Sequence, residues 1–128
     1  MPLRDNIKIM VVDDMSTSRG LLIQPLEKIG VKNIDFRRDG KAALTSLVNS
    51  PAHLVISDYN MPNMDGLQLL KALRENKTTR KIGFILVTGS GDKELINKAR
   101  QYGVNNYLKK PFTPQALQAC IEKVVGKL

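Results

Sequence analysis

At 128 residues the chain is long enough for one domain with a sizeable core, and its 42% hydrophobic and 25% charged residues are ordinary for a globular protein. A single cysteine, Cys120, excludes an intramolecular disulfide and fits a reducing compartment. No apolar stretch approaches the roughly 20 residues that span a bilayer, and the first six residues lack the apolar middle of a signal peptide. We therefore expect one cytoplasmic domain over residues 1–128, with no membrane partner.

The net charge of +8 is the unusual global property. A basic balance can indicate a nucleic-acid partner or an acidic one. The positive residues are scattered, apart from a modest cluster made of Lys71, Arg74, Lys77, Arg80 and Lys81. Because this cluster has no interleaved aromatic residues to stack on bases and no DNA-reading motif, we favour a solvated helix surface over nucleic-acid binding.

The first apolar run, Ile7–Val12, predicts a strand that is covered on both faces. Ser16 or Thr17 is placed to cap the helix that follows, and Gly30 ends its apolar pattern. Pro25 lies inside this helix and removes one backbone hydrogen bond, so we expect a kink.

The next two strands differ in their patterns. Residues 34–36 alternate between apolar and charged, which favours a position nearer an edge of the sheet, and Asp39 then opens a helix. Residues 54–57 form a mostly apolar run, typical of a buried strand. A segment of turn formers follows, and another helix begins after Gly66.

The last third of the chain repeats the alternation. Residues 84–87 form the fourth apolar run, and Asp92 starts the helix after it. Residues 107–108 form a short fifth strand, with a final helix from about Thr113. Five strands thus alternate with five helices over short connections, which predicts an α/β fold with a parallel sheet and helices on both faces.

Polar residues follow four of the five predicted strands. Asp13 and Asp14 end the first, Asp58 the third, Thr88 the fourth and Lys110 the fifth. Because parallel strands point the same way, these side chains meet at one edge of the sheet. Two carboxylates about 4 Å apart repel by about 4 kcal/mol at an effective dielectric of 20, and one lysine neutralises only one of three acids. The site therefore suits a divalent cation.

Oxygen ligands without a nearby His or Cys favour Mg²⁺ over zinc. His53, the only histidine, precedes its strand at the opposite end of the sheet, so we expect it to be solvated. Mg²⁺ that keeps several waters usually works beside a phosphate, and a carboxylate in such a site can act as a nucleophile and become an aspartyl-phosphate. Mg²⁺, Lys110 and the Thr88 hydroxyl have the chemistry to neutralise and position three phosphoryl oxygens.

Four motifs together resemble the response-regulator receiver domain: Asp13-Asp14, the segment Asp58–Gly66, Val87-Thr88 and the segment Tyr107–Phe112. The resemblance covers essentially the whole chain. The segment Asp14–Arg19 and Tyr107 bring it closest to the chemotaxis members of the family. The resemblance implies a flavodoxin-like sheet with strand order 2-1-3-4-5, and a single receiver domain with no output domain.

The resemblance also implies roles for the acids. Asp58 would accept a phosphoryl group from a histidine kinase. Asp13 and Asp14 would hold Mg²⁺, directly or through water, together with Asp58 and the backbone carbonyl of Asn60. Such a domain is a phosphoacceptor that assists its own Mg²⁺-dependent phosphorylation and dephosphorylation, and it is not a turnover enzyme. The resemblance further implies that the positions two after Asp58 and two after Thr88 tune loss of the phosphoryl group; here they are Asn60 and Ser90, neither an acid, so we predict no lifetime for the phosphorylated state.

Thr88 and Lys110 would bind the phosphoryl oxygens. The neighbouring Lys109 is the competing lysine, but the two-residue period of a strand points it the other way. The Lys110-Pro111 bond is expected to be cis, as in the family. Tyr107 corresponds to the family's switch aromatic: if Thr88 moves toward a phosphoryl group, the ring can fill the space that it leaves. Phosphorylation would then shift an existing equilibrium.

The output surface that the resemblance implies carries Lys93, Ile96, Tyr107 and Lys109. Its positive charge suits an acidic partner such as a flagellar motor switch protein. The helix that contains Pro25 is often a docking site for a kinase or phosphatase in this family. We expect the protein to be a monomer.

Three alternatives stay open. A receiver can serve as a phosphate sink or act in a non-motor pathway. An enzyme of the haloacid-dehalogenase type also forms an aspartyl-phosphate, but it wants an Asp-x-Asp pattern, and here the two acids are adjacent. A nucleotide-binding module wants a glycine-rich phosphate loop, and the segment Gly89–Gly91 lacks the third glycine and follows the wrong strand.

Overall fold

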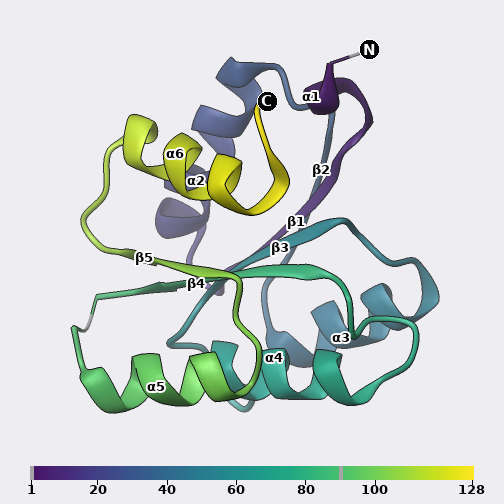
Figure 1. The fold of residues 1–128 in the computed structure, drawn as a ribbon, viewed down its shortest axis with the longest axis vertical. Helices are drawn as coiled ribbons and strands as arrows, with labels where there is room; N and C mark the ends of the chain where they lie inside the picture. Colours follow the sequence, from purple (N-terminus) through teal and green to yellow (C-terminus); the bar gives the residue numbers. More distant parts are fainter. Residues whose placement is uncertain (1, 90) are drawn as a thin grey trace.

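The computed structural model describes residues 2–89 and 91–128, so Ser90 lies outside the described residues. Within them, five parallel strands form one sheet in the expected order β2-β1-β3-β4-β5 (Figure 1). The strands are β1 (Lys8–Val12), β2 (Asn33–Arg37), β3 (Leu54–Asp58), β4 (Gly83–Thr88) and β5 (Asn106–Lys109). The helices are α1 (Leu3–Asn6), α2 (Ser16–Ile29), α3 (Gly40–Asn49), α4 (Gly66–Glu75), α5 (Lys93–Gln101) and α6 (Pro114–Val125).

The short helix α1 corrects our expectation of five helices. A single helical turn is too short to show an apolar periodicity in the sequence. This turn is instead held by contacts with distant parts of the chain. The Arg4 carbonyl accepts a hydrogen bond from Lys32 N at 3.2 Å, and the Arg4 guanidinium donates to the carbonyl of Leu128 at 3.4 Å. None of the helices in the described part of the chain is long and apolar enough to cross a membrane.

The helices cover the two faces of the sheet as separate layers. In Figure 1, α2 and α6 lie on one side, and α3, α4 and α5 lie on the other. Ile9 and Val11 of β1 pack toward α2 and α6, whereas Met10 and Val12 pack toward the opposite layer. This alternation along a central strand explains its continuous apolar sequence, since both faces are buried. The strand β2 lies at an edge and is largely exposed, as its mixed pattern predicted.

Helix starts were mostly predicted correctly. The side chains of Asp39, Asp92 and Thr113 accept hydrogen bonds from backbone amides at the starts of α3, α5 and α6. The expected cap of α2 by Ser16 or Thr17 is wrong: the capping position is Met15, whose side chain makes no capping hydrogen bond. The helix runs on past the buried Pro25, and the kink stays a prediction.

One member of the basic cluster is structural, which corrects our view of the cluster as solvated surface. The Arg74 guanidinium donates hydrogen bonds to the carbonyls of Ile82 at 2.7 Å and Gly103 at 2.9 Å. It also reaches the Asn105 side chain, which accepts a hydrogen bond from Phe84 N. Burial lowers the pKa of Arg74 from its ordinary value. This residue therefore ties the end of α4 to the start of β4.

A close approach between α4 and the end of β3 fixes where Asp58 lies. Tyr59 N donates to the Val87 carbonyl at 2.8 Å, and Gly66 N donates to the Tyr59 carbonyl at 2.9 Å. A Cβ on Gly66 would overlap the Asp58 carbonyl oxygen and lie 2.8 Å from Leu86 Cδ1. The turn between Asp58 and α4 is therefore tight because position 66 has no side chain.

We predict that Gly66→Ala destabilises the protein by about 1–3 kcal/mol, because the new methyl group meets backbone that cannot move aside. Gly20→Ala is the matched control. Gly20 lies inside α2, where a Cβ meets only ordinary contacts, so this change should stabilise the protein by about 0.5–1 kcal/mol. Urea unfolding measures both. Equal effects of the two substitutions would contradict the close approach.

Candidate functional site

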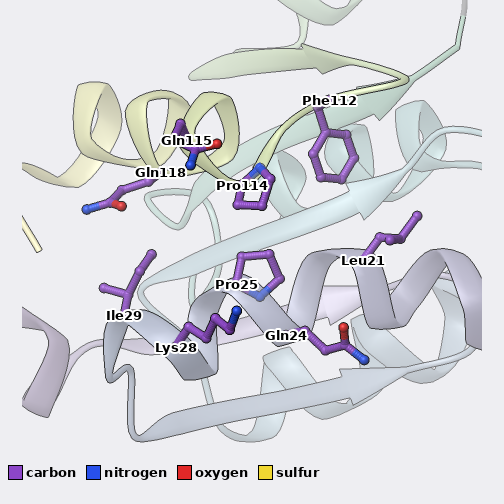
Figure 2. Close-up of a pocket in the computed structure, with 9 residues that line it drawn as sticks. All are labelled: Leu21, Gln24, Pro25, Lys28, Ile29, Phe112, Pro114, Gln115 and Gln118. Carbon is purple, nitrogen blue, oxygen red and sulfur yellow. The ribbon is translucent and has the colours of Figure 1, made fainter.

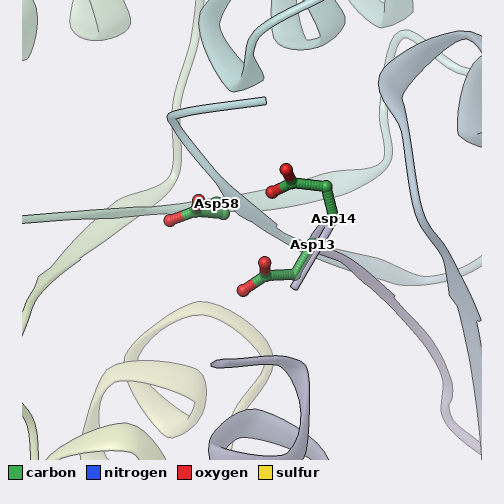
Figure 3. A group of neighbouring side chains, drawn as sticks. All are labelled: Asp13, Asp14 and Asp58. Carbon is green, nitrogen blue, oxygen red and sulfur yellow. The ribbon is translucent and has the colours of Figure 1, made fainter. Parts of the chain in front are cut away.

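Three carboxylates meet at the carboxyl end of the sheet, as the strand plan predicted (Figure 3). Asp13 and Asp14 follow β1, and Asp58 ends β3. One carboxylate oxygen from each lies within 4.8 Å of the other two, with Asp13 and Asp58 buried and Asp14 exposed. His53 is exposed at the other end of the sheet, where its Nδ1 accepts a hydrogen bond from Lys8 N. The side-chain atoms available to bind a metal ion at this site are therefore carboxylate oxygens, which are the ligands that a hard divalent cation prefers.

Lys110 supplies the positive charge at this cluster. Its Nζ lies 2.8 Å from Asp58 Oδ1. Among the described residues, this is the one ion pair that involves any of the three acids. The Lys110-Pro111 peptide bond is cis, as expected. Lys110 N also donates a hydrogen bond to the Thr88 carbonyl at 2.8 Å, so the end of β4 holds the backbone of Lys110 in place. One ammonium group against three carboxylates leaves the excess negative charge that a metal ion would offset.

Asp13 accepts three hydrogen bonds from the start of α2. Its Oδ1 accepts a hydrogen bond from Met15 N at 3.0 Å, and its Oδ2 accepts one from Ser18 Oγ at 2.5 Å. The Asp13 carbonyl accepts a hydrogen bond from Arg19 Nη1 at 3.0 Å. Arg19 is buried beneath Phe36, with its guanidinium 4.4 Å from the ring centroid.

Ser18 and Arg19 are site residues that our sequence reasoning missed. Both belong to the motif Asp14–Arg19, from which neither received a predicted role. Serine and arginine in the first turns of a helix are usually exposed to solvent. No local sequence pattern distinguishes such an exposed residue from one whose side chain turns back toward the end of the preceding strand. The two side chains reach Asp13 because α2 starts shortly after β1 and its first residues turn back toward the end of that strand.

Asp58 carries an unfavourable charge. Burial raises the pKa of its carboxyl above the ordinary value, the hydrogen bond and positive charge of Lys110 act in the opposite direction, and the charges of Asp13 and Asp14 raise it further. The net direction is upward, so removal from water outweighs the single ion pair. The folded protein therefore holds this carboxylate at a cost that a bound cation would relieve.

The other predicted site residues lie around this cluster. Thr88 is buried at the end of β4, one position beyond the Asp58–Val87 pair of the sheet register. Asn60 is exposed in the loop directly after β3. Tyr107 lies on β5 beside β4 and is 39% exposed, so its ring is partly in solvent. The structure thus brings Asp13, Asp14, Asp58 and Lys110 into one site, with Thr88 and Asn60 on the segments that border it.

The four residues of the predicted output surface come from two consecutive elements, α5 and β5. Lys93 and Lys109 are exposed, Ile96 is half-buried, and Tyr107 stands at the solvent edge of β5. The buried residues of α5 are Leu95 and Ala99. Ile96 therefore keeps part of its side chain available at the surface.

The model of the response regulator receiver domain matches residues 9–122. The chain belongs to this family. Receiver domains accept phosphoryl groups in two-component signalling, where they interact with histidine kinases and downstream targets. The match includes β2 to β5, all of β1 except Lys8, and the three acids, so the family assignment rests on nearly the whole sheet.

Similar proteins include chemotaxis members of the family. The chain is 45% identical, over 100% of its length and 99% of the relative, to a probable chemotaxis protein CheY from Rhizobium etli. It is 36% identical to chemotaxis protein CheY-3 from Vibrio cholerae, over 98% of this chain and 97% of that one. Among solved structures, Vibrio cholerae CheY4 matches with a TM-score of 0.85 and 27% identity, over 92% of this chain and 98% of that chain. The receiver is thus CheY-like.

We predict that Asp58→Asn stabilises the metal-free protein at neutral pH by on the order of 1 kcal/mol, as measured by urea unfolding in a chelator. With a raised pKa, the folded state binds the Asp58 proton more tightly than the unfolded chain. The unfolding free energy therefore falls as pH rises from the unfolded pKa through the folded one. The asparagine avoids this loss while its oxygen can still accept from Lys110.

The advantage of Asp58→Asn should vanish below about pH 4, where the carboxyl is protonated in both states. Asp39→Asn is the control: it removes a carboxylate from a helix cap at which asparagine caps equally well, so its effect should stay within about 0.5 kcal/mol. A less stable Asp58→Asn protein at neutral pH would show that the Lys110 pair outweighs burial and repulsion.

Proposed function

We propose that the protein is a CheY-like response regulator whose phosphoacceptor is Asp58. The observation that carries this proposal is the pairing of three carboxylates within 4.8 Å with a lysine 2.8 Å from one of them. A carboxylate that ends a buried strand is fixed in direction but open at the edge of the sheet, as a nucleophile must be. The family match supports the same role for this position.

Asp13, Asp14 and Asp58 are proposed to bind Mg²⁺ with the backbone carbonyl of Asn60. Carboxylates clustered with excess negative charge fit the preference of Mg²⁺ for hard oxygen ligands. When bound, the ion offsets the negative charge of both the acids and the incoming phosphoryl oxygens. The residues themselves set its place, because Asp13 and Asp14 are fixed by the end of β1 and Asp58 by the end of β3.

In the proposed transfer, a carboxylate oxygen of Asp58 attacks the phosphorus of a phosphohistidine on the kinase. An O–P bond forms and the P–N bond breaks, and the electron pair returns to the imidazole nitrogen, which takes up a proton. Lys110 is already within hydrogen-bond distance of the acceptor carboxylate and can move to a phosphoryl oxygen. The hydroxyl of Thr88, at the end of the neighbouring strand, is proposed to bind a second oxygen. Transfer then depends on position and charge, as phosphoryl transfer generally does.

A groove beside the site is the proposed docking place for the kinase, and also for a phosphatase. It encloses about 410 Å³ between α2 and the start of α6. Figure 2 shows Pro25 of α2 facing Pro114 of α6 across it, with Leu21 and Phe112 at the same end of the groove. A second apolar hollow, lined in part by Leu21, Phe112 and Lys110, continues toward the acids. A partner helix seated here would lie next to Asp58.

The switch is proposed to run from Thr88 to Tyr107. Tyr107 is partly exposed on the strand next to Thr88, and its ring is proposed to turn inward into the space that the threonine leaves when it moves toward a phosphoryl group. The surface made by Lys93, Ile96, Tyr107 and Lys109 would then favour an acidic partner.

The similarity to chemotaxis proteins supports a flagellar motor switch protein as that partner. We propose that the protein acts there as a cytoplasmic monomer.

We predict that acetyl phosphate with Mg²⁺ labels the protein with one phosphoryl group, and that Asp58→Ala abolishes the label. Asp65→Asn, a change at the cap of α4 beyond the acidic cluster, is the control and should keep it. Intact-mass spectrometry counts the groups. Normal labelling of Asp58→Ala would refute the proposed acceptor, and sustained release of many phosphates per protein would favour a haloacid-dehalogenase-like enzyme.

We also predict that phosphorylation, or beryllium fluoride as its mimic, raises affinity for a flagellar motor switch protein at least about tenfold, which corresponds to about 1.4 kcal/mol of coupling. Tyr107→Ala should reduce this gain while leaving labelling intact, since the ring lies on β5 away from the acids. Titration calorimetry with and without the mimic measures the ratio. Equal affinities in the two states would favour a phosphate sink or a non-motor pathway.

A further inference from the structure

The hydroxyl of Ser18 connects the two halves of the site. Its Oγ lies 2.5 Å from Asp13 Oδ2 and 3.1 Å from Lys110 Nζ. An ammonium group can only donate, so the hydroxyl must accept from Lys110 and give its own hydrogen to Asp13. Since Lys110 also bonds Asp58 Oδ1 at 2.8 Å, one continuous chain of polar contacts runs from Asp13 through Ser18 and Lys110 to Asp58.

We propose that Ser18 is a positioning residue that orients both the Asp13 carboxylate toward the metal and the Lys110 ammonium toward the phosphoryl group. This inference rests on the proposed function of the same site. Ser18 touches neither the metal nor the phosphoryl group in this scheme, and it acts through the two residues that do.

The effect on Asp13 follows from the geometry of its two oxygens. Met15 N holds Oδ1 at 3.0 Å and Ser18 Oγ holds Oδ2. Without Ser18, the carboxylate is held at one oxygen and can rotate about that contact. Hydrogen-bond partners of metal-binding carboxylates fix ligand orientation, and their loss commonly lowers metal affinity by about 10–100-fold.

The effect on Lys110 follows from its three hydrogens. In the resting site one hydrogen bonds Asp58 and one bonds Ser18. On phosphorylation the first contact must be exchanged for a phosphoryl oxygen, whereas the Ser18 contact can stay in place throughout. Ser18 belongs to the first turn of α2, so its hydroxyl is carried on a rigid element that packs on β1. It therefore keeps the flexible lysine pointed into the site during the exchange.

The test compares Ser18→Ala, Ser18→Thr and Ser16→Ala. Ser16 is exposed in the same turn of α2 and is the matched control. Mg²⁺ binding to the unphosphorylated proteins is measured by titration calorimetry, and the rate of labelling by acetyl phosphate is measured against Mg²⁺ concentration. Thermal unfolding in a chelator verifies that each variant is folded.

We expect Ser18→Ala to weaken Mg²⁺ binding roughly tenfold. We also expect its labelling rate to be several-fold lower even at saturating Mg²⁺, because Lys110 is then poorly placed. Ser18→Thr, which keeps the hydroxyl, should restore both quantities to within about twofold, and Ser16→Ala should change neither.

Unchanged Mg²⁺ affinity or an unchanged saturated rate in Ser18→Ala would overturn the proposal. A loss that Ser18→Thr does not restore, or that Ser16→Ala shares, would overturn it too. The unsubstituted protein separates this failure from that of the proposed function: if it binds no Mg²⁺ and takes no label, the site itself is misassigned, whereas normal behaviour in both proteins refutes only the role of Ser18.

Discussion

Repulsion among three carboxylates held together by the backbone is the constraint on which this site depends. Asp13, Asp14 and Asp58 end two adjacent parallel strands, so the sheet brings their charges together whether or not anything neutralises them. Lys110 balances one of the three negative charges. The pKa of Asp58 is nevertheless raised, because burial and the repulsion from Asp13 and Asp14 outweigh the stabilisation of the carboxylate by Lys110. A site in this condition has an electrostatic preference for added positive charge, which fits the divalent ion that we propose.

The rest of the fold makes this arrangement rigid enough to persist. Apolar layers on both faces bury the central strands, and the close approach of Gly66 to the Asp58 carbonyl fixes the turn that follows Asp58. The first turns of α2 hold Asp13 through Ser18 and Arg19. The stability supplied by the apolar core thus offsets the repulsion among the three carboxylates at the edge of the sheet. The residues of the proposed site therefore lower the stability of the fold. Tyr107, partly exposed on β5 beside β4, is where we propose that a change at the acids reaches the surface.

The sequence predicted the sheet and the meeting of the acids because both follow from strand ends, which are visible as apolar runs that stop at a charged residue. It predicted the helix caps at Asp39 and Asp92 for the same local reason. It failed where tertiary contact decides: α1 is one turn held by Lys32 and the C-terminal Leu128, and Arg74 reaches backbone carbonyls far along the chain. Ser18 was overlooked because its partner Lys110 lies 92 positions away.

The most direct measurement is a crystal structure with Mg²⁺ and beryllium fluoride. We predict one metal ion coordinated by Asp13, Asp58 and the Asn60 carbonyl, with Asp14 bound directly or through water. Beryllium should be bonded to an Asp58 oxygen, and the Lys110 ammonium should have moved from that carboxylate to a fluorine. A metal ion bound away from the three acids, or beryllium fluoride on any residue other than Asp58, would contradict the account.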